Sequence, residues 1–399
     1  MKIGIIMEGK IPVDERVPLT PEQVRHITDK YSEIEIYVQS SDIRRIKDSE
    51  YEALGIPVVD DVSHCDVLLG VKEVPVEQLI PNKTYYFFSH TIKMQPYNKP
   101  LLAAIVENDI TLVDWECLRD AQGRRLIGFG RHAGLVGAYN GLRMIGEITG
   151  KFSLKPAYTC DDEHDFFKRL DAVRLEPMNI LLTGRGKVAK GALEVLSRIG
   201  VEQVGIREFL TGGGKKPQVC QITFTDYFKH VSGKDLGHRH FLQHPEEYRS
   251  DFMRFAEVTD FFIAGHYWDP RAPYLFTRED CRKPEFRIKY VADISCDIDG
   301  PVACTIRPST IDHPFYGYDP QSEKETSLNA DGAIAVMAVD NLPCELPKAA
   351  SREFGKMFLH AVLPSLLNGD KLGIIHRATI VKKGEITPNY SYLREWLNQ

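Results

Sequence analysis

The sequence predicts an α/β protein with two doubly wound domains, and three observations carry this prediction. The chain has 399 residues, which exceeds what one ordinary hydrophobic core supports, so two domains are expected. Short apolar segments alternate with helical patterns in the N-terminal part, as is typical of a parallel sheet covered by helices. A second unit of this kind opens with MNILLTGRGKVAKGALEVLSRIG at residues 178–200.

The N-terminal domain begins with a strand, a helix and a second strand. KIGIIM (2–7) has the apolar character of a strand, and TPEQVRHITDKY (20–31) is typical of a helix with Thr20 as its N-cap. The short apolar run 67–71 suits a parallel strand that is buried on both faces. Other elements are expected as a strand over 33–38, an aromatic strand starting at 85, a helix over 98–110 and a strand over 111–116.

The middle of the chain is expected to form the second domain. A glycine- and alanine-rich helix is predicted over 132–149, and FFIAG and YVADISCD are expected to be strands of the second sheet. The strongest helical pattern of the C-terminal region is ASREFGKMFLHAVLPSLL. We therefore expect one domain over residues 1–131 completed by 332–399, and a dinucleotide-binding domain over 132–331.

Composition and charge exclude several classes of protein. The net charge of −6 argues against a nucleic-acid partner, and no apolar run approaches the length of a membrane span. The N-terminus has no long apolar segment of the kind found in signal peptides. The eight cysteines include no C-x-x-C pair, which favours reduced thiols in the cytoplasm over disulfides or zinc. The expected partners are small molecules, and a homo-oligomer stays open.

A glycine turn between a predicted strand and a predicted helix indicates a dinucleotide site. Gly184, Gly186 and Ala189 satisfy the pattern G-x-G-x-x-[GA]. The first glycine permits the tight turn, the second lets the backbone approach a pyrophosphate, and the third small residue lets helix and strand pack closely. The expected phosphate-binding segment is Gly184, Arg185, Gly186, Lys187, Val188 and Ala189.

The choice between NAD and NADP is left open by the sequence. An acidic residue that holds the ribose hydroxyls is expected about 20 positions after the first glycine, and Glu208 lies near that distance. Its neighbour Arg207 is suited to a 2′-phosphate instead. A solvated Arg–Glu pair at the end of a strand is an equally acceptable interpretation.

Charged residues follow several strands of the predicted N-terminal sheet. Because parallel neighbours end at the same edge, these residues are expected to share one cleft. An excess of cations suits a substrate with several carboxylates, since arginine forks bind carboxylates in pairs of hydrogen bonds. The charged residues expected in this cleft are Arg16, Lys72, Glu73, His90, Lys93, Glu116 and Arg125.

Two of these residues suggest acid–base chemistry. A lysine crowded by other cations in a partly dry cleft has a lowered pKa and can act as a general base, as proposed for Lys72. A histidine such as His90 titrates near neutrality and can exchange protons with a carbonyl or water. Together with a nicotinamide cofactor, these groups predict an amino-acid or imine dehydrogenase.

Six stretches resemble one known family along nearly the whole chain. They are ERVPLTP, GVKEVP, FFSHTIKMQ, DWECLRDAQGRRLIGFGRHAG, VADISCDIDGP and DNLPCELPKAAS. The chain is similar to the lysine-forming saccharopine dehydrogenases, and most similar to the lysine–ketoglutarate reductase part of bifunctional aminoadipic semialdehyde synthases. FFSHTIK with QGRR is specific to this group, whereas ERVPLTP is shared with the wider alanine dehydrogenase and transhydrogenase superfamily.

The resemblance implies a fold, a reaction and residue roles. It implies two Rossmann-like domains with an active-site cleft between them, and the reversible, NAD(P)-dependent reductive joining of lysine and 2-oxoglutarate to saccharopine. By the same resemblance Lys72 exchanges a proton with the substrate nitrogen, and His90 serves the carbinolamine and imine steps. The remaining implied roles are pKa tuning by Glu73 and Glu116, substrate-carboxylate binding by Arg16, Lys93 and Arg125, an active-site position for Lys10, and a place near the nicotinamide for Asp293.

Two other functions and one other site are less well supported by the residues. An alanine dehydrogenase-like enzyme would lack SHTIK and QGRR, and a non-catalytic nucleotide-sensing subunit would need neither Lys72 nor His90. His238, His240 and His244 in HRHFLQH suggest a metal, but they lie in a polar insertion without a carboxylate or cysteine at ligand spacing. A solvated helix face is therefore favoured there, and no metal is expected.

Overall fold

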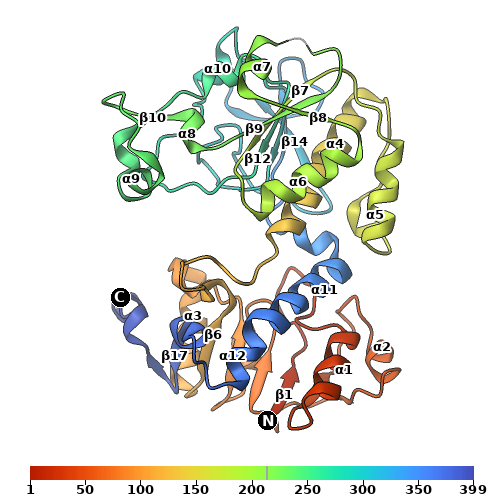
Figure 1. Ribbon diagram of the computed structural model, residues 1–399, viewed down its shortest axis with the longest axis vertical. Helices are drawn as coiled ribbons and strands as arrows, with labels where there is room; N and C mark the ends of the chain where they lie inside the picture. Colours follow the sequence, from red (N-terminus) through yellow and green to blue (C-terminus); the bar gives the residue numbers. More distant parts are fainter. Residues whose placement is uncertain (213) are drawn as a thin grey trace. The chain divides into compact units, whose positions relative to one another are not determined.

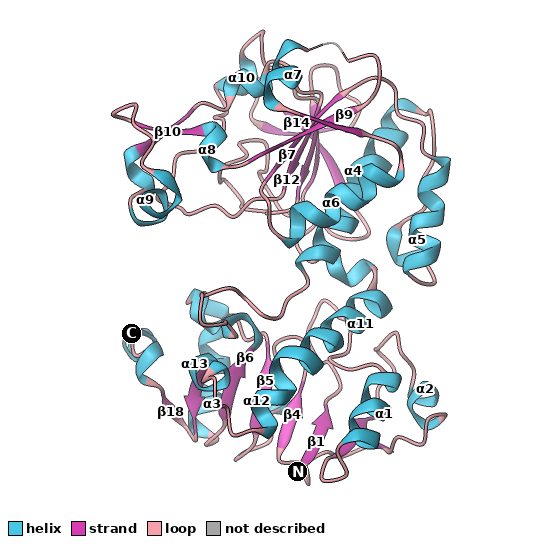
Figure 2. Ribbon diagram, in the orientation of Figure 1, coloured by secondary structure: helices cyan, strands magenta, loops and turns pink. Residues whose placement is uncertain are grey.

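The computed structural model describes residues 1–212 and 214–399, and the chain divides into two compact units. Unit 1 comprises Met1–Phe129 and Pro347–Gln399, and unit 2 comprises Gly130–Leu346. Both units contain an eight-stranded, mostly parallel sheet with helices packed on it, so the expected α/β class is confirmed (Figure 2). Among the described residues, no helix is long and apolar enough to cross a membrane.

Unit 1 is built on a sheet whose strand order is β18-β17-β6-β5-β4-β1-β2-β3. The six strands from β6 to β3 are parallel, and β17 and β18 add antiparallel strands at one edge (Figure 1). The strands are β1 Lys2–Ile5, β2 Glu35–Gln39, β3 Val58–Val59, β4 Val67–Leu69, β5 Thr84–Phe87, β6 Thr111–Asp114, β17 Thr379–Lys382 and β18 Glu385–Ile386.

Helices cover both faces of this sheet, and the aromatic strand shows why. Along β5 and the residue after it, Tyr86 and Phe88 join one buried cluster, and Tyr85 and Phe87 join the other. Alternate side chains of a strand point to opposite faces, so four consecutive aromatics fill both. The helices are α1 Pro21–Lys30, α2 Asp48–Glu52, α3 Lys99–Glu107, α11 Pro347–Met357, α12 Leu363–Leu367, α13 Ile374–Ala378 and α14 Tyr392–Asn398.

Helix α1 begins as the sequence predicts. Thr20 precedes it in extended conformation, and Pro21 occupies its first turn, where a missing N–H leaves no helical hydrogen bond unmade. The Gln23 side chain accepts a hydrogen bond from the Thr20 backbone N–H at 2.9 Å. This bond satisfies one of the N–H groups left open at a helix start, so the cap is confirmed.

Unit 2 is built on a sheet whose strand order is β15-β14-β16-β13-β12-β7-β9-β8. The strands from β16 to β8 are parallel, and β14 and β15 are antiparallel additions at one edge. The strands are β7 Asn179–Thr183, β8 Glu202–Val204, β9 Gln218–Ile222, β12 Phe261–Ala264, β13 Tyr290–Asp293, β14 Phe315–Asp319, β15 Lys324–Thr326 and β16 Ile334–Met337.

Two long helices of unit 2 pack unusually closely through glycines. A Cβ on Gly191 of α6 would lie 2.1 Å from the Arg131 carbonyl oxygen of α4, and one on Gly134 would lie 1.9 Å from the Val188 carbonyl oxygen. Only glycine permits this approach. The helices of unit 2 are α4 Gly130–Thr149, α5 Glu163–Arg169, α6 Lys187–Arg198, α7 Ile206–Thr211, α8 Phe224–Tyr227, α9 Gly237–Gln243 and α10 Met253–Ala256. A separate hairpin pairs β10 Phe228–His230 with β11 Tyr248–Ser250.

The unit boundaries differ from those expected at 131/132 and 331/332. The compact units meet at 129/130 and 346/347. Strand β16 lies after residue 332 but pairs with β13 and β14, so the chain leaves the second sheet only after it. The sequence signal failed here because the apolar run AIAVMAV suits either sheet, and pairing partners decide between them.

Candidate functional site

The charged residues of unit 1 follow four strands that are neighbours in the sheet. Strands β1, β4, β5 and β6 pair in parallel, so their carboxyl ends share one edge. Lys72 and Glu73 follow β4, His90 follows β5, and Glu116 follows β6. Glu116 lies in the short 3₁₀ turn Trp115–Cys117 and not on the strand that was predicted over 111–116. This edge is where open α/β sheets bind ligands.

Glu73 joins two of the predicted residues. One of its oxygens accepts a hydrogen bond from Lys10 Nζ at 2.7 Å, and the other lies 2.6 Å from His90 Nδ1. Burial alone would raise the pKa of Glu73, but the hydrogen bonds and charges of His90 and Lys10 lower it to about 2. Glu73 is therefore ionised, and it orients the imidazole so that Nε2 is left for other contacts.

The neighbouring residue Lys72 does not take part in these hydrogen bonds. The part of the chain described by the structure supplies no hydrogen bond or ion pair to Lys72 Nζ. Burial, followed by the positive charges of Arg16 and Lys10, lowers the pKa of the Lys72 ammonium, and the negative charge of Glu73 opposes them. These are the conditions under which a lysine becomes a proton acceptor.

Glu8 is a buried carboxyl that the sequence analysis missed. It is 5% exposed and accepts the backbone N–H groups of Val71 at 2.6 Å and Lys72 at 3.0 Å. Burial and the charge of Asp14 raise the pKa of Glu8 to about 8, against the opposing effect of the two backbone N–H groups. Its position directly after the strand predicted over residues 2–7 was the available signal, because ligands of α/β sheets collect beyond the carboxyl ends of strands.

Arg16 does not present the free fork expected of a substrate-binding arginine. Its Nε donates to Asp14 Oδ1 at 2.9 Å, its Nη2 to Asp14 Oδ2 at 2.5 Å, and both side chains are 1% exposed. The guanidinium also lies over the Phe129 ring, 4.1 Å from its centroid. Arg16 therefore acts on the site through its charge, which lowers the pKa of Lys72.

The turn that carries His90 is held by buried polar groups. His90 has the left-handed φ of 53°, which is uncommon for a residue other than glycine and indicates a constrained position. The preceding Ser89 is fully buried, and its backbone N–H donates to Asp114 at 2.9 Å. The His90 ring stacks on Phe88 with 6.3 Å between centroids. The imidazole is thus positioned by its backbone, by an aromatic ring and by Glu73.

Glu116 forms a second, more open cluster with two cations. Lys93 Nζ lies 3.9 Å and Arg125 Nη1 3.5 Å from the Glu116 carboxylate. The side chains of Lys93 and Arg125 are 48% and 39% exposed, so both remain accessible. Arg125 also lies over the Phe88 ring, 5.4 Å from its centroid, and His90 stacks on this same ring. Hence Lys93 and Arg125, unlike Arg16, are available to a carboxylate ligand.

The glycine turn of unit 2 has the shape that a dinucleotide requires. Gly184 has φ +94°, and a Cβ there would lie 2.5 Å from the Gly265 carbonyl oxygen. A Cβ on Gly186 would meet nothing within 4 Å, so the backbone at the start of α6 is open to an approaching group. Ala189 is fully buried against the sheet. These residues fit a pyrophosphate at the helix start, with the exposed Arg185 and Lys187 beside it.

His266 lies against this turn and was not predicted as a site residue. Its Nδ1 is 2.7 Å from the Thr183 hydroxyl, and its Nε2 is buried without a hydrogen-bond partner among the described residues. Burial lowers the pKa of His266 to about 4, so the ring is neutral at pH 7. The motif GHYWDP contained the signal, but a histidine after a strand is too common to be selected without its surroundings.

The predicted ribose-binding pair lies in a different place from that expected. The strand beside β7 is β9, and β8 pairs only with β9. Arg207 and Glu208 follow the edge strand β8 and belong to α7. In dinucleotide folds the ribose-binding acid follows the strand next to the glycine-turn strand. That position is occupied by the residues after β9, whereas Arg207 and Glu208 follow the edge strand, and their expected role toward the ribose stays a prediction.

The end of β9 carries the polar residues that the sequence analysis missed. The Gly184 backbone N–H donates to the Ile222 carbonyl at 2.8 Å, which joins this strand end to the glycine turn. Asp226 Oδ2 accepts the Thr223 N–H at 2.7 Å and the Thr223 hydroxyl at 3.0 Å. Asp226 Oδ1 accepts no hydrogen bond from the described residues. Asp226 lies 42 positions after Gly184, beyond the usual spacing, because α7 and β8 intervene.

Asp293 ends β13 as predicted, but its carboxylate is used within the chain. It is fully buried and accepts hydrogen bonds from the Ser295 hydroxyl at 2.6 Å and the Thr305 hydroxyl at 2.7 Å. Burial raises the pKa of Asp293, although these hydrogen bonds oppose the rise. Both oxygens of Asp293 therefore accept hydrogen bonds within the turn after β13, and its expected place near the nicotinamide stays a prediction.

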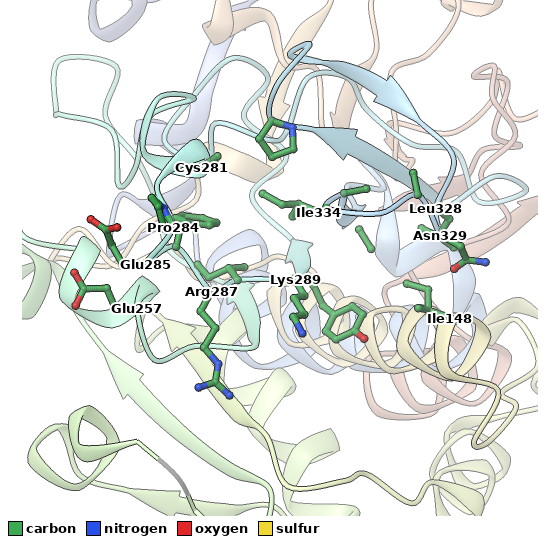
Figure 3. A pocket seen from close by; sticks show the side chains of 18 residues that line it. Ile148, Glu257, Cys281, Pro284, Glu285, Arg287, Lys289, Leu328, Asn329 and Ile334 are labelled. Atoms are coloured by element: carbon green, nitrogen blue, oxygen red, sulfur yellow. The ribbon is translucent and has the colours of Figure 1, made fainter.

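A hollow of about 780 Å³ lies at the opposite edge of the unit 2 sheet. It is lined by the residues at the beginning of β13 and β16, including Tyr290 and Ile334, with Arg287 and Lys289 at its side (Figure 3). Ligands of open α/β sheets collect beyond the carboxyl ends of strands, and this hollow is at their amino ends. We do not assign the cofactor to it.

Comparison with known proteins gives relatives for both units. Residues 4–136 match the family model of the alanine dehydrogenase/PNT N-terminal domain. The chain is 30% identical over 437 aligned positions to an alpha-aminoadipic semialdehyde synthase of Arabidopsis thaliana, covering 98% of this chain and 41% of that protein. It is 28% identical to a saccharopine dehydrogenase [NAD(+), L-lysine-forming] of Candida glabrata, covering 92% of this chain and 91% of that protein.

The solved structures support the fold. An L-alanine dehydrogenase superposes with a TM-score of 0.68 at 15% identity, and the match covers the whole of both chains. The chain spans less than half the length of the semialdehyde synthases that it matches. The resemblance read from the six sequence stretches is therefore confirmed, and the reaction remains to be argued from the site.

Proposed function

We propose that this chain, which is homologous to the aminoadipic semialdehyde synthases and the lysine-forming saccharopine dehydrogenases, is a pyridine-nucleotide-dependent oxidoreductase that acts on a CH–NH bond. Its proposed reaction is the reversible reductive joining of lysine and 2-oxoglutarate to saccharopine. The observation that carries this proposal is the pair of acid–base groups at one sheet edge: a half-buried Lys72 with a lowered pKa, and His90 held by Glu73.

His90 is the proton carrier for the steps at the carbonyl carbon. When an amine adds to a ketone, the carbonyl oxygen must gain a proton and later leave as water. An imidazole oriented by a carboxylate on Nδ1 can supply both protons through Nε2. The 2.6 Å contact with Glu73 holds that orientation, and Lys10 balances the charge on the far oxygen of Glu73.

Lys72 is the proton carrier for the nitrogen. The attacking amine must lose a proton before addition, and the imine nitrogen must gain one as hydride reaches its carbon. A lysine whose pKa is lowered gives up its proton more readily and can exchange these protons. When bound, the nicotinamide cofactor supplies or accepts the hydride, and the residues Gly184–Ala189 are proposed to hold its pyrophosphate.

The substrate carboxylates are assigned to the exposed cations. Lys93 and Arg125 flank Glu116, and both keep accessible donors. A product with three carboxylates requires several such partners, and arginine binds one carboxylate with two hydrogen bonds. Arg16 is not assigned to a substrate carboxylate, because its guanidinium already donates two hydrogen bonds to Asp14.

We infer that NAD is the preferred cofactor. Asp226 follows the strand beside the glycine turn, and its free Oδ1 suits ribose hydroxyls, whereas its charge opposes a 2′-phosphate. The relative from Candida glabrata is named as NAD(+)-dependent, which supports the same choice. All eight cysteines are free thiols, and this supports the proposed location in the reducing cytoplasm. Self-association stays an open proposal.

The first test is an assay of the purified chain that follows absorbance of the reduced nicotinamide. NADH and NADPH are each offered with lysine plus 2-oxoglutarate, with either compound alone, and with pyruvate plus ammonia. Saccharopine or alanine with the oxidised cofactors tests the reverse reactions. We expect oxidation of NADH only when lysine and 2-oxoglutarate are both present.

The alternative outcomes separate the rival functions. Turnover of alanine, or of pyruvate with ammonia, would show that the substrates are those of an alanine dehydrogenase and not lysine and 2-oxoglutarate. Measurable nucleotide binding without turnover of any substrate would favour a nucleotide-sensing subunit and remove the proposed catalytic roles of Lys72 and His90.

A further inference from the structure

An excursion from the second sheet brings together histidines that are distant in the sequence. It leaves the sheet after β9 and forms the hairpin of β10 and β11, with helix α9 between the two strands (Figure 1). His230 ends β10, His240 lies on α9, and Glu247 directly precedes β11. Their ligand atoms all lie within 4.8 Å of one another.

The two imidazoles converge on one carboxylate. His230 Nε2 lies 2.9 Å and His240 Nε2 3.8 Å from the same oxygen of Glu247. Ligand atoms around a tetrahedral zinc ion are separated by about 3.3 Å, given bond lengths near 2.0 to 2.1 Å. The observed separations lie on either side of that value, so small side-chain rotations would admit an ion.

The second nitrogen of each ring is already held by a hydroxyl. His240 Nδ1 lies 3.2 Å from the Tyr248 hydroxyl. His230 Nδ1 lies 2.7 Å from the Ser232 hydroxyl and also accepts the Ser232 backbone N–H at 3.1 Å. Metal-binding histidines are commonly oriented by such a contact on the nitrogen that does not bind the metal. These contacts on Nδ1 leave Nε2 of both rings directed toward Glu247, and an ion bound there would take the place of the proton that His230 Nε2 shares with Glu247.

We propose that His230, His240 and Glu247 form a site for one divalent transition-metal ion of the zinc class. Two imidazoles and one carboxylate are a known zinc ligand set, with the fourth position left to water. The His230 side chain is 10% exposed and that of Glu247 is 44% exposed, so the site has a buried side and an open side through which an ion can enter. A bound ion would join β10, α9 and the start of β11.

This site differs from the one that the sequence suggests. HRHFLQH groups His238 with His240 and His244, but the His238 ring packs on Phe224 with 4.9 Å between centroids. His230 and Glu247 lie outside the motif, and the pairing of β10 with β11 brings them in. The motif HRHFLQH has no carboxylate at ligand spacing, but the fold places Glu247 beside His230 and His240.

The experiment is a titration of the chelator-treated full-length chain with zinc chloride by isothermal calorimetry, repeated with cobalt chloride and visible spectroscopy. We expect one saturable zinc site and cobalt bands typical of nitrogen and oxygen ligands, without sulfur charge-transfer bands. His230→Gln and Glu247→Gln should each weaken zinc binding by roughly 10-fold to 100-fold or more. The matched control His238→Gln should keep the affinity within about a factor of two.

Three results would overturn the proposal. They are the absence of a saturable zinc or cobalt site in the wild-type chain, unchanged affinity in both His230→Gln and Glu247→Gln, and sulfur charge-transfer bands that assign the ion to cysteines. Circular dichroism shows whether each variant is folded, and the wild-type cobalt spectrum decides the ligand type without any variant. Because the readout is metal binding, this test is independent of the proposed oxidoreductase activity.

Discussion

Lys72 and Glu73 are adjacent in the sequence, yet the fold gives them opposite environments. Glu73 lies within hydrogen-bond distance of Lys10 and His90, and these partners hold the pKa of its carboxyl at about 2. Lys72 has nearby cations and partial burial, which lower the pKa of its ammonium. The pair thus combines a permanent anion that orients His90 with an amine that can give up its proton. The sequence indicated both residues, but only the contacts distinguish their tasks.

Removal of either acid–base group should slow turnover without unfolding the chain. We expect Lys72→Met and His90→Gln each to lower kcat by roughly 10² or more, the usual contribution of positioned acid–base groups. The matched control is Lys30→Met, which removes an exposed lysine from α1. Steady-state assays and thermal unfolding are measured together. If both site variants kept the kcat of the wild type, the proposed mechanism would be contradicted.

Glu8 should make the stability of the chain depend on pH. Its pKa is raised from 4.5 to about 8, so the folded state binds a proton that the unfolded state has lost. Stability therefore falls as the pH rises between these two values, and levels off above them. Glu8→Gln cannot ionise, so its melting temperature relative to wild type should rise from acid toward pH 8. A flat difference, like that expected of the exposed control Glu33→Gln, would contradict the assignment.

At the scale of elements, the order of strands in the second sheet decides which residues can meet the cofactor. The segment after α6 forms the edge strand β8, and the chain then returns to place β9 beside β7. Local patterns predicted β7, α6 and the glycine turn, because strand and helix periodicities are properties of neighbouring residues. They could not predict this order, because the pairing of β7 with β9 joins residues about 40 positions apart.

The strand order leads to a prediction about cofactor choice. Asp226→Asn keeps a side chain that can accept hydrogen bonds from Thr223, but removes the charge that opposes a 2′-phosphate. We expect the ratio of kcat/KM for NADH to that for NADPH to fall by about 10-fold, equivalent to roughly 1.4 kcal/mol. Arg207→Ala is the matched comparison and should leave this ratio nearly unchanged. If Arg207→Ala changed this ratio more than Asp226→Asn, the residues after β8 would be the ones that select the cofactor.

At the scale of the whole molecule, unit 1 is assembled from both ends of the chain. Phe354 of α11 packs on Trp115 at 5.3 Å and on Phe129 at 4.9 Å between ring centroids. Strand β17 extends the same sheet by pairing with β6. Residues 1–129 thus lack part of their core without residues 347–399, whereas unit 2 is continuous in sequence.

This arrangement predicts how fragments behave. A fragment of residues 130–346 should fold cooperatively by itself, because its sheet and the helices on it are complete. Residues 1–129 alone should not, because the apolar surface under α11 would be exposed to water. Joining residues 1–129 to 347–399 with a short flexible linker should restore a cooperative thermal transition by circular dichroism. Cooperative folding of residues 1–129 alone would contradict this account.

Local patterns in the sequence were enough to predict the α/β class, most strands and helices, the glycine turn, and the set of charged residues at the sheet edge of unit 1. Each of these follows from short-range periodicity, turn geometry or the rule that parallel strands end at one edge. Four features could be seen only in the folded chain. Arg16 donates its hydrogen bonds to Asp14, Asp293 is buried, β9 lies beside β7, and His230 contacts Glu247. These features depend on pairing and burial between separated residues, and such contacts are set by the path of the chain.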